Sequence, residues 1–109
     1  MVMIGLSGDS RIFMCSEPVD FRKGVEGLSL VTQGLFPDKL LTGAYFAFLN
    51  GARNKIKVLY WDLDGFIIWY KRLEKGTFSR NLAKEQMDRR DFFLLLEGVT
   101  PQKIRPRFQ

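Results

Sequence analysis

Two strand-forming runs around a tight turn constrain the fold of this chain most. Residues 55–63 (KIKVLYWDL) and 66–73 (FIIWYKRL) are rich in β-branched and aromatic residues, and an Asp-Gly pair at 64–65 separates them. This pattern favours a β-hairpin with a two-residue turn. Such a turn predicts a register in which Lys57 faces Arg72. Because neither hairpin face is cleanly polar, either both faces are covered or one keeps an aromatic surface for a partner.

Further strands and helices are expected on both sides of the hairpin. Residues 11–16 (RIFMCS) and 44–49 (AYFAFL) are typical of strands. A helix is predicted from an N-cap at Asp20 to about Leu35. Its apolar positions recur at spacings of three and four, as one buried face requires, at Val25, Leu28, Val31 and Leu35.

A second helix is predicted over about 84–97, ending at Gly98, and its FFLLL run indicates deep packing. We therefore predict an α+β fold in which an antiparallel sheet of about four strands, centred on the hairpin, packs against two helices.

At 109 residues the chain has the length of one domain, expected over 1–100, with a basic tail over 101–109. No apolar run reaches the ~18 residues of a membrane helix, and the first residues lack a basic signal-peptide region. We expect no membrane partner and a cytoplasmic protein.

The net positive charge comes from the second half of the sequence. Residues 1–54 carry five basic and five acidic groups, whereas residues 55–109 carry twelve basic and seven acidic groups, which accounts for the net charge of +5. A basic half-domain points to a polyanionic partner, most often nucleic acid. Many small basic domains bind no nucleic acid, so composition alone does not decide.

The residue inventory excludes several kinds of catalytic site. The chain has no histidine and one cysteine, Cys15, so it holds neither a Ser-His-Asp triad nor a Cys-His nucleophile. Asp62 and Asp64 could contact a divalent metal, but the turn explains Asp64, and no third carboxylate lies nearby in sequence. We therefore predict no catalytic residue, no metal site and no cofactor. A small nuclease using these two aspartates is the least favoured reading.

Two groups of cations are candidates for contacts with nucleic acid. Arg22 and Lys23 are expected in a first helical turn, where acidic residues are usual, so they could form a phosphate seat with the helix N-terminus. Alternatively, both could reach outward to Glu26 or Glu17. The second group lines the hairpin: Arg53, Lys55, Lys57, Lys71, Arg72 and Lys75.

Basic groups follow a phosphate backbone, and aromatic faces can stack on bases. The alternative is an ordinary core sheet, in which the aromatic rings are buried and the cations at the strand ends are solvated. For Trp61 and Trp69 we favour burial over stacking on bases. The tail adds Arg105 and Arg107.

Several blocks together resemble one bacterial family. DFRKGVEGL at 20–28, KIKVLYWDLDGFIIWYKRLEKGTF at 55–78 and LLLEGV at 94–99 are similar to the TnpB-type accessory protein of IS-sixty-six family insertion sequences, the product of the element's second reading frame. The resemblance covers about 11–107. One departure is Ala83-Lys84-Glu85, where the family has a Thr or Ser helix cap.

The resemblance implies a protein encoded beside a separate transposase, with a role in DNA transposition and no established catalytic activity. We expect a non-enzymatic factor that binds DNA or assembles the transposition complex, with DNA and the transposase as partners. The alternative is a protein-only adaptor that docks on the transposase without touching DNA. It would use an exposed aromatic face or the last helix.

Overall fold

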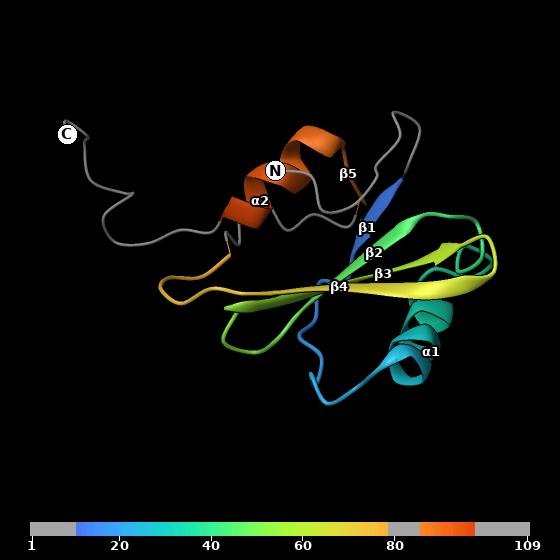
Figure 1. Ribbon diagram of the computed structural model, residues 1–109, viewed down its shortest axis with the longest axis horizontal. Coiled ribbons are helices and arrows are strands. Elements are labelled where there is room, and N and C mark those ends of the chain that lie inside the picture. The colour runs from blue at the N-terminus through green and yellow to red at the C-terminus, as the bar shows by residue number, and fades with distance from the viewer. Residues whose placement is uncertain (1–10, 79–85, 98–109) are drawn as a thin grey trace.

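The computed structural model describes residues 11–78 and 86–97, which form a five-stranded sheet between two helices (Figure 1). The strand order across the sheet is β4-β3-β2-β1-β5. The predicted α+β class is confirmed. The elements are β1 (Ile12–Met14), α1 (Val25–Leu35), β2 (Tyr45–Leu49), β3 (Lys55–Asp62), β4 (Gly65–Arg72), β5 (Gln86–Met87) and α2 (Arg89–Glu97).

The sheet is mixed rather than purely antiparallel. β1 and β2 run parallel, with Ile12 opposite Tyr45, whereas the β1–β5, β2–β3 and β3–β4 pairs are antiparallel. The chain leaves β1, passes through α1 and returns as β2, and such a crossover brings two strands into the same direction. The prediction of an antiparallel sheet is wrong for this pair, because the pairing depends on where α1 packs and not on a local turn.

Both faces of the central strand, β2, are buried. Figure 1 shows α1 against one face and α2 against the other. Phe46 and Phe48 of β2 point to the α1 side, while Tyr45, Ala47 and Leu49 point to the α2 side, and all five are buried. The sequence left open whether both hairpin faces are covered. The structure buries residues of β3 on both faces, whereas every residue of β4 is half-buried or exposed. Helices on both sides therefore explain why the strands read as nearly continuous apolar runs.

The β3–β4 hairpin turns one residue earlier than predicted. Asp62 pairs with Gly65, so the loop residues are Leu63 and Asp64 rather than Asp64 and Gly65. Each cross-strand partner moves by two residues, so Lys57 faces Tyr70 and no longer Arg72. Because the side-chain period of a strand is two, this shift leaves every side chain on its predicted face.

Helix α1 begins at Val25, not directly after Asp20. The Asp20 carboxylate accepts a hydrogen bond from the Arg22 amide at 2.9 Å, and the Asp20 carbonyl accepts one from the Lys23 amide at 3.1 Å. These two bonds close a separate turn in front of the helix, and Gly24 becomes its N-cap. The prediction that Asp20 caps the helix is therefore wrong, since an aspartate can also stabilise a turn through its own backbone.

The predicted apolar face of α1 is only partly correct. Leu28 is buried and Val31 half-buried, but Val25 and Leu35 are exposed. Thr32 occupies the remaining buried position, where its hydroxyl donates to the Leu28 carbonyl at 2.8 Å. A threonine fits a buried helix face in this way because the helix backbone satisfies its hydroxyl.

Helix α2 begins at Arg89, after the short strand β5, and not at residue 84. Asp88 is its cap, because a carboxylate oxygen of Asp88 accepts a hydrogen bond from the Asp91 amide at 2.8 Å. The deep packing predicted for the FFLLL run is confirmed by the burial of Phe92, Leu95 and Leu96. The expected helix end at Gly98, the segment 83–85 and the tail 101–109 lie outside the described residues.

Within residues 11–78 and 86–97, neither helix has the length and apolar character needed to cross a membrane.

Candidate nucleic-acid interface

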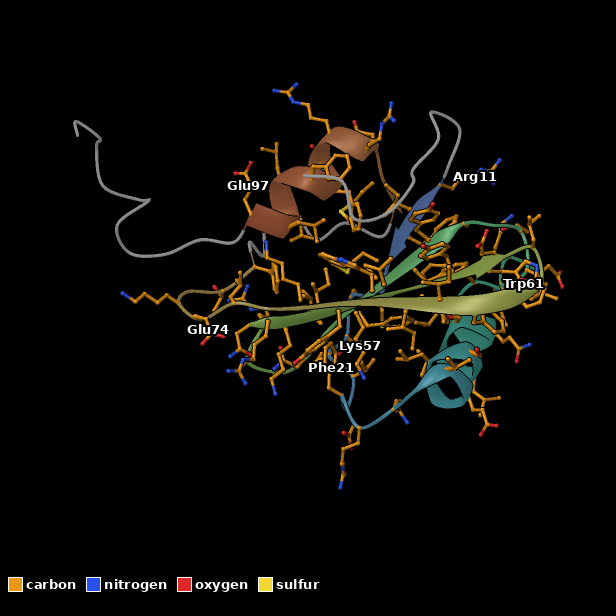
Figure 2. The ribbon with its side chains drawn as sticks, viewed as in Figure 1. Arg11, Phe21, Lys57, Trp61, Glu74 and Glu97 are labelled. Carbon is orange, nitrogen blue, oxygen red and sulfur yellow. The ribbon has the colours of Figure 1, made fainter. Side chains whose placement is uncertain are left out.

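The β3–β4 hairpin carries opposite charges at its two ends. At its open end, where β3 begins and β4 stops, Lys55 and Arg72 lie opposite one another. At its closed end, Asp62 and Asp64 are both exposed. Figure 2 shows Glu74 beyond the open end and Trp61 near the closed end. We call the open end, with Arg53, Lys55, Arg72 and Lys75, the basic end.

Positive charge at the basic end is poorly compensated. A terminal guanidinium nitrogen (Nη2) of Arg72 lies 3.3 Å from Oε2 of Glu74, but both side chains are well exposed, so this ion pair contributes little to stability. Among the described residues, the ammonium groups of Lys55 and Lys75 have no hydrogen-bond or ion-pair partner. Like charges directly opposite one another on neighbouring strands are destabilising. The Lys55–Arg72 pairing is therefore not explained by stability.

Arg53 is positioned by the turn between β2 and β3. The side-chain oxygen of Asn50 accepts hydrogen bonds from the amides of Asn54 and Lys55 at 3.1 and 3.0 Å, which organises this turn. Arg53 has a positive φ of 57° and donates one guanidinium hydrogen bond to the Phe78 carbonyl at 3.1 Å. This contact joins the basic end to the segment that follows β4.

Lys57 supports the loop in front of α1. Its ammonium donates to the carbonyl oxygens of Phe21 and Lys23, each at 2.9 Å, and lies 5.0 Å from the centre of the Phe21 ring. Figure 2 shows Lys57 and Phe21 close together on the α1 side of the sheet. Lys57 therefore stabilises the loop before α1, and two of the three N–H groups of its ammonium are used in these hydrogen bonds.

Lys71 points to the opposite face of the sheet. Its ammonium donates to the Leu96 carbonyl at 2.7 Å. This carbonyl lies in the last turn of α2, where the helix dipole favours a cation. The candidate cations are thus divided between the two faces, because Lys55, Lys57 and Arg72 lie on the α1 side.

Arg22 and Lys23 lie in the turn before α1, so their predicted position in its first helical turn is wrong. Arg22 pairs with Asp20 at 2.6 Å, rather than with Glu26 or Glu17. Hydrogen bonds from the Arg22 side chain and amide hold the pKa of Asp20 well below its usual range. Lys23 is exposed, and its stem packs close to the helix: a Cβ on Gly27 would lie 3.0 Å from the Lys23 Cβ.

A cavity of about 360 Å³ opens beside Arg53. Its lining includes Cys15, Glu17 and Asn50. The Cys15 thiol donates to the Glu17 carbonyl at 3.2 Å, and burial raises the pKa of this thiol. A raised pKa keeps the sulfur protonated, and a protonated thiol is a weak nucleophile.

Phe21 and Tyr70 belong to the same surface and were not predicted. Their rings lie 6.3 Å apart, and Tyr70 faces Lys57 across the strand pair. Sequence reasoning missed this group because Phe21 lies in a loop far from β3 and β4 in the chain, and it meets Lys57 and Tyr70 only where that loop packs against the sheet. The other predicted contacts, Arg105 and Arg107, lie outside the described residues.

The aspartates of the closed end do not form a metal centre with other residues that the structure describes. No group of three or more cysteine, aspartate or glutamate side chains gathers within the described ranges. Trp61 packs edge-on against Phe66 with ring centres 5.0 Å apart, and Trp69 packs against the core on the α2 side. Both tryptophans are half-buried, but only Trp69 packs against one of the two core clusters.

The sequence profile of the family described as "IS66 Orf2 like protein" matches residues 10–106. The chain belongs to the IS66 Orf2-like family. It is therefore an accessory protein of an insertion sequence, with a role in transposition. This IS66 Orf2-like chain is also similar to an uncharacterized protein, y4jC, of Sinorhizobium fredii (strain NBRC 101917 / NGR234), at 35% identity over 107 residues, covering 94% of this chain and 91% of the relative. No solved structure matches the chain.

Proposed function

We propose that this IS66 Orf2-like protein is a non-catalytic DNA-binding factor of transposition, and that its basic end contacts DNA phosphates. The observation that carries the proposal is the pairing of Lys55 opposite Arg72, with Glu74 the single acidic partner beside them in the described part of the chain. A like-charge pair of this kind costs stability in the free protein. Phosphates bound between the two cations would remove this repulsion, and its removal would contribute to the free energy of DNA binding.

The candidate residues have different roles in this proposal. Lys55, Arg72 and Lys75 contact phosphates directly, together with the guanidinium donors that Arg53 does not use for Phe78. Arg22 and Lys23 extend the surface on the α1 side, and Arg105 and Arg107 add contacts from the tail. Lys57 and Lys71 act indirectly, since their ammonium groups bind backbone carbonyls.

The salt dependence of DNA binding tests the proposal. We expect the log of the affinity for a mixed-sequence duplex to fall linearly with the log of the salt concentration. Replacing Lys55 and Arg72 with alanine should make that slope shallower by about two units, since each phosphate contact contributes about 0.9. An Arg11→Ala/Lys39→Ala variant removes the same charge from sites outside the basic end and should leave the slope unchanged.

Equal slopes for the two double variants, or no binding by the wild-type protein at low salt, would refute the proposal.

The second candidate is a protein-only adaptor that docks on the transposase. The observation that favours it is apolar exposure on the helices: Leu30 of α1 is 69% exposed, and Leu94 of α2 is 39% exposed. A pull-down with the transposase of the same element, repeated after nuclease treatment, separates the two functions. Capture that survives nuclease, combined with no shift of free DNA, favours the adaptor.

A further inference from the structure

Strand β4 is a sheet edge with little protection. In the described part of the chain it pairs with β3 alone, through eight consecutive residue pairs without a bulge. Residues 66–70 (FIIWY) contain neither a proline nor a charge. Natural edge strands are usually short, charged, bulged or covered, because an open edge is a template for another strand. The length and composition of β4 therefore favour pairing of its open edge with a further strand.

The hydrogen-bond alternation shows which backbone groups face outward. The Leu73 amide donates to the Asn54 carbonyl at 2.8 Å, so these two residues form a hydrogen-bonded pair with β3. In an antiparallel ladder such pairs alternate, so Lys71, Trp69 and Ile67 also direct their backbone groups toward β3. The amide and carbonyl groups that point away from the sheet belong to Phe66, Ile68, Tyr70 and Arg72.

We propose that β4 pairs antiparallel with β4 of a second copy of this chain across a two-fold axis, forming a continuous ten-stranded sheet. The outward groups all belong to even-numbered residues, so these residues must pair with one another. The register that best matches side chains places Ile68 opposite Ile68 of the second copy. It then sets Phe66 opposite Tyr70 of the second copy, and it brings the turn residue Asp64, just before β4, beside Arg72 of the second copy.

The charge distribution favours a second copy over an unrelated strand. The hairpin is acidic at its closed end and basic at its open end, so antiparallel pairing brings each acidic end beside the basic end of the other copy. A two-fold axis repeats this complementarity twice. Pairing would also cover Tyr70, which is 48% exposed at the edge. This inference does not rest on DNA binding, because it follows from the open edge of β4 and from the charges at the two ends of the hairpin. In the dimer Arg72 faces a carboxylate of the second copy, and this leaves Lys55 and Lys75 for phosphate contacts.

Amide hydrogen exchange of the full chain, over a series of protein concentrations and without DNA, tests the interface directly. We expect the Ile68 and Tyr70 amides to exchange quickly at low concentration and to become protected as sedimentation shows the dimer forming. The Ile67 and Trp69 amides, which bond to β3, should be protected throughout. A monomer at every concentration overturns the proposal, as does a dimer whose Ile68 and Tyr70 amides stay unprotected.

Charge reversal tests the register. Arg72→Asp and Asp64→Arg should each raise the dimer dissociation constant about tenfold, because each change sets like charges opposite one another at two symmetric places. The combined variant should restore the wild-type constant. Arg90→Asp, an exposed change on α2, is the control and should have no effect.

Failure of the combined variant to recover overturns the proposed register. A third variant, Tyr70→Pro, removes an outward amide while leaving the ladder with β3 intact and should abolish the dimer. If Ile68 and Tyr70 become protected only when the transposase is added, the edge accepts a different protein and the second-copy proposal is wrong.

Discussion

At the scale of single residues, Lys57 shows that a cation in a basic segment can serve the fold. Replacing Lys57 with methionine keeps the aliphatic stem but removes both hydrogen bonds to the loop carbonyls of Phe21 and Lys23. We expect the free energy of unfolding to fall by about 1.5–3 kcal/mol, the usual contribution of hydrogen bonds to a charged group. Urea denaturation measures this loss, and faster trypsin cleavage after Arg22 or Lys23 would locate it in the loop.

Lys55→Met is the matched control for Lys57→Met, because Lys55 lies on the same face of β3, two residues away, without such partners among the described residues. It should leave stability nearly unchanged and weaken DNA binding. Equal stability losses for both lysine variants would show that Lys57 does not act as a support.

A second residue-scale prediction concerns Leu63 at the hairpin turn. This side chain is 90% exposed, and its φ is 62°, a region that leucine rarely adopts. The Asp64 amide donates to the Asp62 carbonyl across it, which is the strained form of γ-turn. Leu63→Gly should therefore raise the free energy of unfolding by about 0.5–1 kcal/mol, as relief of strain exceeds the added chain entropy. A lower midpoint in thermal unfolding would contradict this account.

At the scale of elements, α2 depends on contacts at both of its ends. Asp88 caps its first turn, and Lys71 binds the Leu96 carbonyl in its last turn. Asp88→Ala should lower the free energy of unfolding by about 1 kcal/mol, whereas Asp88→Asn, which keeps the accepting oxygen, should cost much less. Chemical denaturation followed by circular dichroism compares the two. Equal losses would mean that the carboxylate charge, rather than the cap, stabilises the helix.

At the scale of the whole molecule, the two helical layers share one sheet, and β2 contributes buried residues to both sides. We therefore expect both layers to unfold in one cooperative transition. The two tryptophans report on opposite layers, since Trp61 contacts Phe66 on the α1 side and Trp69 packs on the α2 side. Trp61→Phe and Trp69→Phe variants should each give coincident fluorescence and circular dichroism midpoints. Separated midpoints in either variant would show that the layers unfold independently.

Local patterns predicted most of the elements but placed some of their ends wrongly. The strand runs, both helices and the alternation of the hairpin faces followed from residue periodicity, which acts over a few residues. The start of α1 and the hairpin turn depended on competition between neighbouring hydrogen bonds. Asp20 stabilises a turn instead of a helix, and Leu63 accepts a strained conformation that an Asp-Gly pair would have avoided.

The sequence by itself determined the α+β class, the family, and the location of the net positive charge in the second half of the chain. It also predicted which side chains share a face of the hairpin. These properties depend on composition and short-range spacing. Only the tertiary structure decided that β1 and β2 run parallel, and that Lys57 and Lys71 bind backbone carbonyls on opposite faces of the sheet. The physical reason is that each of these contacts joins segments distant in the chain, and their partners exist only once the layers have packed.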